Sequence, residues 1–186
     1  MPQSRPASIE AGIAAPLLHA AQGCLLAAAT AMLVIIGTPS ARAGALSRGA
    51  AAFDHRDYAR AARDLVPLAE RGNPRALGLV GFMYEHGFGV PQAYDAAFDF
   101  YCRGAVQGNP FAQAMLGLMY DKGHGVHPDF IQAYKWLDLA TARSHGRERD
   151  AYARFRDAIA SKMSRDEIIV GQRLALSWVP GVPIQP

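Results

Sequence analysis

The sequence predicts an all-α fold, an α/α superhelical solenoid of helix-turn-helix repeats with terminal capping helices. Two observations predict it. One segment of the sequence recurs 36 residues later. When 72–106 is aligned with 108–142, 11 of 35 positions are identical. Each copy also carries glycine, asparagine and proline where one helix would end and the next begin. A fixed period of this length is typical of helical solenoids, whose units bury their apolar faces against their neighbours.

The composition fits one ordered domain and excludes some partners. The chain has 186 residues, and 51% of them are apolar, which is ample for a core. Its formal net charge is +3, and without residues 1–43 it is +2, from 17 basic and 15 acidic residues. This small excess predicts no nucleic-acid partner.

The N-terminal segment predicts export. Arg5 and His19 precede the apolar run Leu25–Ile36, and Ala41-Arg42-Ala43 then offers small residues at a cleavage site. This order is typical of a secretory signal, so we expect cleavage near Ala43 and a periplasmic or secreted protein. The alternative is an uncleaved membrane anchor, although the segment from Gly23 to Gly37, 15 residues long, is short of the ~20 that a spanning helix needs. Cleavage would leave Cys102 as the one cysteine, which we expect to be a buried helical thiol.

Two Gly-Asn-Pro triplets, at 72–74 and 108–110, mark the starts of the repeats. Glycine tolerates the left-handed conformation that ends a helix, asparagine caps the next helix, and proline fills its first position. The triplets predict first helices Pro74–His86 and Pro110–Lys122, followed by second helices Tyr94–Gln107 and Phe130–Ser144. The positions expected to maintain this repeat structure are Gly81, Tyr84, Gly87, Gly89, Gly117, Tyr120, Gly123 and Gly125.

Helical patterns continue on both sides of the repeats. Asp57 is placed to cap a helix that closes at Gly72, and Ser164 to Glu167 has the spacing of a capping box. The expected organisation is a signal peptide 1–43, a linker with a short helix 44–56, an N-terminal cap helix 57–71, repeat 1 at 72–107, repeat 2 at 108–146, C-terminal capping helices 147–180 and a tail 181–186.

A family resemblance follows from these motifs. The pattern Ala-x-x-x-(Val/Leu)-Gly-x-Met-Tyr-x-x-Gly-x-Gly-Val occurs twice, at 76–90 and 112–126. It resembles the Sel-one-like repeat of exported bacterial proteins, a relative of the tetratricopeptide repeat. The resemblance implies a superhelix that serves as a protein-interaction scaffold, and it supplies no catalytic motif.

The first helix of each repeat carries an additional, partly apolar stripe beside its buried face. In this architecture the first helices line the concave groove, so the stripe predicts a docking surface for a partner helix or peptide. The alternative is that the same side chains pack between adjacent repeats. The stripe consists of Arg75, Leu79, Phe82 and His86 in repeat 1, and Phe111, Met115, Leu118 and Lys122 in repeat 2.

The sequence offers little chemistry of its own. His124 and His127 near Asp121 are the nearest approach to a metal site, but a metal wants three or four convergent ligands, so we expect no metal and solvated loop histidines. No nucleophile, phosphate-loop or dinucleotide motif is present, so we expect no catalytic residue and no cofactor. The sequence thus predicts an exported adaptor that binds another protein or peptide. The alternatives are an envelope hydrolase or cell-wall-active enzyme, and a structural subunit of an envelope complex.

Overall fold

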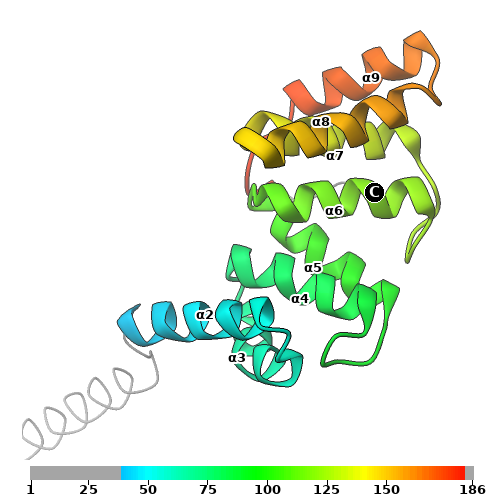
Figure 1. Cartoon of the computed structure of the whole chain (residues 1–186). Coiled ribbons are helices and arrows are strands. Elements are labelled where there is room, and N and C mark those ends of the chain that lie inside the picture. The colour runs from blue at the N-terminus through cyan, green and yellow to red at the C-terminus, as the bar shows by residue number, and fades with distance from the viewer. Residues whose placement is uncertain (1–38, 183–186) are drawn as a thin grey trace, which may run out of the picture. The chain divides into compact units, whose positions relative to one another are not determined.

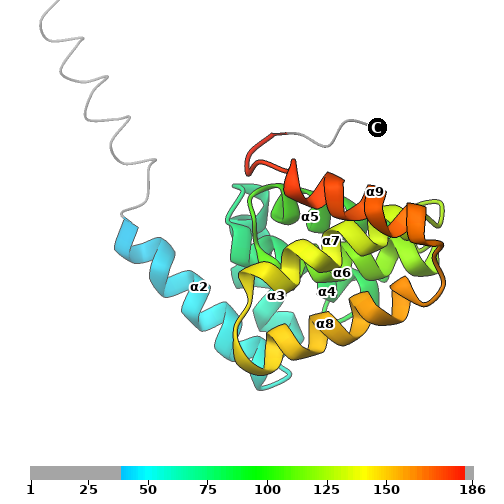
Figure 2. The ribbon, with the colours of Figure 1, turned by 90° about the horizontal axis from the view of Figure 1, so that it is seen from above.

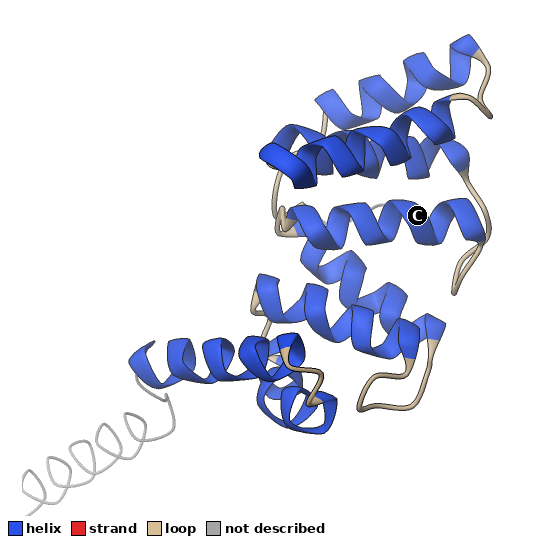
Figure 3. Ribbon diagram, in the orientation of Figure 1, coloured by secondary structure: helices blue, strands red, loops and turns tan. Residues whose placement is uncertain are grey.

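The computed structural model describes residues 39–182, and side chains from Gly44 onwards. All contacts discussed below lie within one compact unit, Arg42–Pro186. Residues 1–38 and 183–186, with most of the expected signal peptide and the end of the expected tail, lie outside the described residues. The described residues form helices and no strands (Figures 1 and 3). The helices are α2 (Pro39–Asp54), α3 (Tyr58–Glu70), α4 (Pro74–His86), α5 (Tyr94–Val106), α6 (Pro110–Lys122), α7 (Phe130–Arg143), α8 (Gly146–Ala160) and α9 (Arg165–Leu176).

The four helices of the two repeats begin and end within one residue of their predicted limits. The side chain of Asn73 accepts hydrogen bonds from two backbone N–H groups at the start of α4, and Asn109 accepts one at the start of α6. Gly72 and Gly108, which follow α3 and α5, have a φ of 83°, and Gly87 and Gly123 end α4 and α6 with a φ of 71°. The predicted roles of glycine and asparagine are therefore confirmed.

Small residues let the two helices of each repeat approach closely. A Cβ added to Gly81 would lie 2.7 Å from the buried ring of Tyr101, and one added to Gly117 would lie 2.9 Å from the carbonyl oxygen of Ala133. Neither position has room for a larger side chain. The glycines are thus required by packing between α4 and α5 and between α6 and α7.

The segment expected to be a linker with a short helix, 44–56, is helical through Asp54, because α2 runs from Pro39 to Asp54. Within this helix, Gly49 lies against Leu65 of α3 at a distance too short for a Cβ. The expected cleavage point after Ala43 falls within this helix. The expected short helix is therefore present and is longer than expected, and Gly49 permits its close packing on α3.

Helices α2 and α3 form a hairpin built like the two repeats. Key positions of α3 recur at intervals of 36 in α5 and α7: Tyr58, Tyr94 and Phe130 begin the three helices, and Ala61, Ala97 and Ala133 are all fully buried. The loop between α2 and α3 has only three residues, 55–57, whereas the loop from α4 to α5 has seven, 87–93. The shorter loop shifts α2 out of the 36-residue register, which hides the likeness in the sequence.

Helices α8 and α9 both pack on α7 (Figure 2). Tyr152 and Ile159 of α8 are buried in the same apolar cluster as Leu137 of α7, while Gly171 of α9 lies against the ring of Tyr134. Ser164 forms the predicted capping box with Glu167 at the start of α9.

The segment after α9 contacts α7 and the end of α5. The Trp178 ring meets Trp136 of α7 edge-on, with centroids 6.3 Å apart. The Gly181 N–H donates to the carbonyl oxygen of Val106 at 2.8 Å. The segment after α9 therefore fastens the last helix to the end of α5.

Candidate partner-binding groove

A depression of about 220 Å³ lies among the first helices of successive hairpins. Its lining comes from α2, α4, the start of α6, and α8, which are the elements at alternate places in the chain. Helices at the two ends of the array thus contribute to one hollow, so these four helices surround a concave face. The lining residues are Ala50, Asp54, Arg75, Leu79, Asn109, Phe111 and Glu148.

The structure brings three of the eight predicted groove residues together at this depression: Arg75, Leu79 and Phe111. The apolar members of the stripe are all half-buried, and its polar members are exposed. The half-buried members are Leu79, Phe82, Phe111, Met115 and Leu118, and the exposed ones are Arg75, His86 and Lys122.

Phe82 does much of the packing between hairpins. Its ring lies 5.9 Å from that of Phe53 on α2 and 6.1 Å from that of Phe111 on α6, measured between centroids. The ring of His86 stacks on that of Phe82, with centroids 4.0 Å apart. Phe82 therefore packs between adjacent hairpins, and of the four rings only Phe111 lines the depression.

Three charged side chains line the depression, and sequence reasoning selected only one of them. Asp54 comes from α2 and Glu148 from α8, and neither helix was expected to face the groove. Within residues 44–182, none of Asp54, Arg75 and Glu148 forms an ion pair shorter than 4.0 Å. Their charges are therefore free to interact with solvent or with a ligand.

The histidines near Asp121 do not converge on a metal. His124 packs its ring against Tyr94, with centroids 4.4 Å apart, while the Asp121 carboxylate pairs with Lys162 at 2.6 Å. His127 is exposed. Across the described part of the chain, no three His, Cys, Asp or Glu side chains come close enough to hold an ion.

The groups with strongly shifted pKa values lie in helix contacts and not in the lining of the depression. Burial raises the pKa of Cys102 to about 12, with a further contribution from Asp99. Burial also raises the pKa of Tyr101, as do the charge of Glu85 and the 2.9 Å hydrogen bond that Tyr101 donates to it. Both side chains are uncharged at neutral pH, as the apolar contacts around them require.

Hairpins packed in series, close helix contacts at glycines and a concave face lined by alternate helices define an α/α solenoid. Within this class, residues 74–109 and 110–145 each match the Sel1 repeat family. The chain therefore contains two Sel1 repeats, which confirms the repeat type that its sequence resembles. Sel1 repeats commonly serve as protein-interaction scaffolds.

Two solved structures have a similar fold. One is a protective antigen present in uropathogenic Escherichia coli strains and displaying an SLR fold, with 23% identity and a TM-score of 0.67 over 74% of this chain and 29% of that one. The other is a Sel1 repeat protein from Oxalobacter formigenes, with 25% identity and a TM-score of 0.56 over 72% of this chain and 56% of that one. The chain thus spans less than two thirds of either protein.

A comparison with curated proteins found no similar sequence. Among the described helices, none combines the length and the apolar character needed to cross a membrane.

Proposed function

We propose that this chain is a scaffold that binds another protein or peptide through its concave face. The observation that carries the proposal is the depression to which both ends of the array contribute, with an apolar floor and three charged groups free of ion pairs. Such a combination suits a protein ligand, because apolar contacts supply affinity and charged groups at the edge supply selectivity. Repeat arrays use concave surfaces of this kind for binding.

We further propose that the partner is met outside the cytoplasm. The support is the N-terminal order of charged, apolar and small residues, ending at Ala43. A partner in the envelope or the medium fits both parts of the proposal. Expression of the full chain, followed by cell fractionation and N-terminal sequencing of the purified protein, tests export. A protein that begins near Gly44 outside the cytoplasm supports it, and an intact chain in the cytoplasmic fraction contradicts it.

Site-specific photo-crosslinking in the native host tests the binding face. The photoreactive amino acid p-benzoylphenylalanine is placed at Arg75 or Lys122 on the concave side, and at Asp95 or Arg173, exposed residues of α5 and α9, as matched controls. The proposal predicts one crosslinked protein from the two concave positions and none from the controls. Crosslinking from α5 and α9 alone would move the binding surface to the other face.

A further inference from the structure

We propose that the depression receives one apolar side chain of a partner segment that carries a basic residue on each side of it. This inference rests on the proposed function and specifies its ligand. The depression holds about 220 Å³, below the 300–1,000 Å³ typical of sites for whole small molecules. Its size therefore suits a single side chain.

The apolar part of the lining comes from three helices. Ala50 of α2, Leu79 of α4 and Phe111 of α6 face the same space, and Leu79 and Phe111 are half-buried by their own packing. Because these side chains are already ordered by their neighbours, an inserted leucine, methionine or phenylalanine would gain apolar contact at little cost in the scaffold's entropy.

The charged part of the lining has a net negative sign. Asp54 lies on α2 and Glu148 on α8, the first and last of the four helices around the hollow, while Arg75 lies between them on α4. A ligand segment seated in the depression therefore has one carboxylate from each of two helices beside the apolar floor. An apolar side chain flanked by basic ones complements these groups.

Arg75 does not reverse this preference. It lies one helical turn from Leu79, so its aliphatic stem can cover apolar surface while its guanidinium stays in solvent. Two carboxylates against one guanidinium leave the lining at −1. Since charges at an exposed edge act mainly on selectivity and association rate, the expected signature is discrimination between ligands of opposite charge.

Fluorescence anisotropy with three labelled ten-residue peptides tests the inference on the full chain. The peptides share an alanine and glycine background and differ at the centre, with Arg-Leu-Arg, Arg-Ser-Arg or Glu-Leu-Glu. We expect Arg-Leu-Arg to bind at least tenfold more tightly than either of the others. The double substitution Asp54→Lys with Glu148→Lys is expected to abolish that preference and to favour Glu-Leu-Glu.

The control is a double substitution with the same change of net charge elsewhere. Asp95→Lys with Asp166→Lys changes two exposed carboxylates on α5 and α9 and should leave the order of the three peptides unchanged. Equal binding of all three peptides, binding of none, or an equal response to both double substitutions would overturn the inference. If the concave positions still crosslink a partner in that case, the proposed function stands and only the ligand's chemistry is wrong.

Discussion

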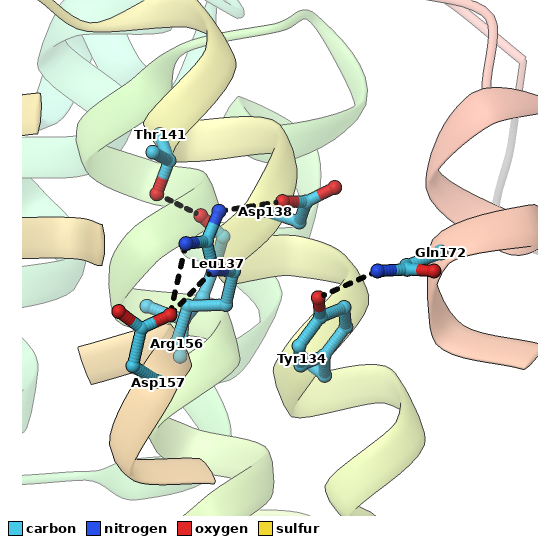
Figure 4. A network of polar contacts seen from close by, with 7 residues as sticks. All are labelled: Tyr134, Leu137, Asp138, Thr141, Arg156, Asp157 and Gln172. Carbon is cyan, nitrogen blue, oxygen red and sulfur yellow. Dashed lines mark hydrogen bonds and ion pairs between the residues drawn. The ribbon is translucent and has the colours of Figure 1, made fainter. Parts of the chain in front are cut away.

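At the inner junction, where α5 meets α6, Cys102 and Tyr120 lie in one apolar cluster. At the terminal junction, where α7 meets α8, the positions 36 residues further on hold Asp138 and Arg156, which form an ion pair at 3.0 Å (Figure 4). The same place in the fold therefore carries neutral packing in one case and a charge pair in the other.

The contacts of the first residues of α5 and α7 differ in the same way. At the inner junction the ring of His124 packs on Tyr94, the first residue of α5. At the terminal junction the first residue of α7 is Phe130, and the ammonium group of Lys162 lies 5.4 Å from its ring centroid. The helix packing of the solenoid therefore continues beyond the repeats that carry the sequence motif. In the terminal hairpin, charged side chains replace the contacts of glycine loops and aromatic rings.

The largest expected effect concerns the glycine loop of the inner junction. Gly125 has a φ of 68°, and an added Cβ would lie 2.6 Å from the carbonyl oxygen of Tyr94. We expect Gly125→Ala to lower the free energy of unfolding by about 3 kcal/mol, from backbone strain and steric overlap together. Gly72→Ala is the matched control, because Gly72 has a φ of 83° but nothing within 4 Å of the added Cβ, so it should cost about 1 kcal/mol. Urea denaturation measures both, and equal losses would show that the loop contact is unimportant.

The residue pair of the inner junction, Cys and Tyr, should be able to replace the ion pair of the terminal junction. Arg156 and Asp138 are about a quarter and a third exposed, at 26% and 31%. We expect Arg156→Tyr alone to cost about 2 kcal/mol, because it leaves a partly buried carboxylate without its donor. Adding Asp138→Cys should recover most of that loss by restoring the pair found at the inner junction. Strictly additive losses in this double-mutant cycle would contradict the equivalence of the two positions.

Raising the pH should lower the stability of the inner junction more than that of the terminal junction. An unfolded thiol loses its proton near pH 8.5, whereas the pKa of Cys102 in the folded chain is about 12. The folded state thus keeps a proton that the unfolded state releases, and stability falls as the pH rises from about 8.5 towards 12. By pH 9.5 the expected loss is about 1 kcal/mol. Urea titrations at pH 7.5 and 9.5 under reducing conditions measure it, and Cys102→Val should remove it.

The smallest effect is expected for Lys162. Its pair with Asp121 is partly solvated, with the lysine side chain 47% exposed. We expect Lys162→Met to lower the free energy of unfolding by roughly 0.5 kcal/mol at low salt and by less in 1 M NaCl, where such pairs are screened. A loss that is independent of salt would assign the contribution to the aliphatic stem on Phe130.

The sequence predicted the helix limits of the two repeats correctly, but not the full extent of the helix that precedes them. Gly72, Asn73 and Pro74 predicted helix limits correctly because each residue type has a distinct backbone preference. The extent of α2 was not predicted in this way, and its Gly49 serves close packing against Leu65 of α3. A search for the 36-residue period upstream would have found Tyr58 and Ala61 as the equivalents of Tyr94 and Ala97.

The groove was only partly predictable for a different reason. Arg75, Leu79 and Phe111 lie in the repeats, where the period reveals the face of each helix. Asp54 and Glu148 lie outside the repeats, and they reach the same depression only because small rotations between successive hairpins add up along the solenoid. The positions of the end helices thus depend on the rotation at every junction between hairpins, so no local pattern in the sequence predicts them.

The most direct test of the proposed binding face is methyl NMR of the full chain with the partner identified by crosslinking. The signals to follow are those of Leu79, Met115 and Leu118 on the concave side, with Ile169 and Leu176 on α9 as exposed controls. If the concave face binds the partner, the signals of Leu79, Met115 and Leu118 shift or broaden as partner is added, and those of the two controls do not. Changes confined to Ile169 and Leu176 would contradict it.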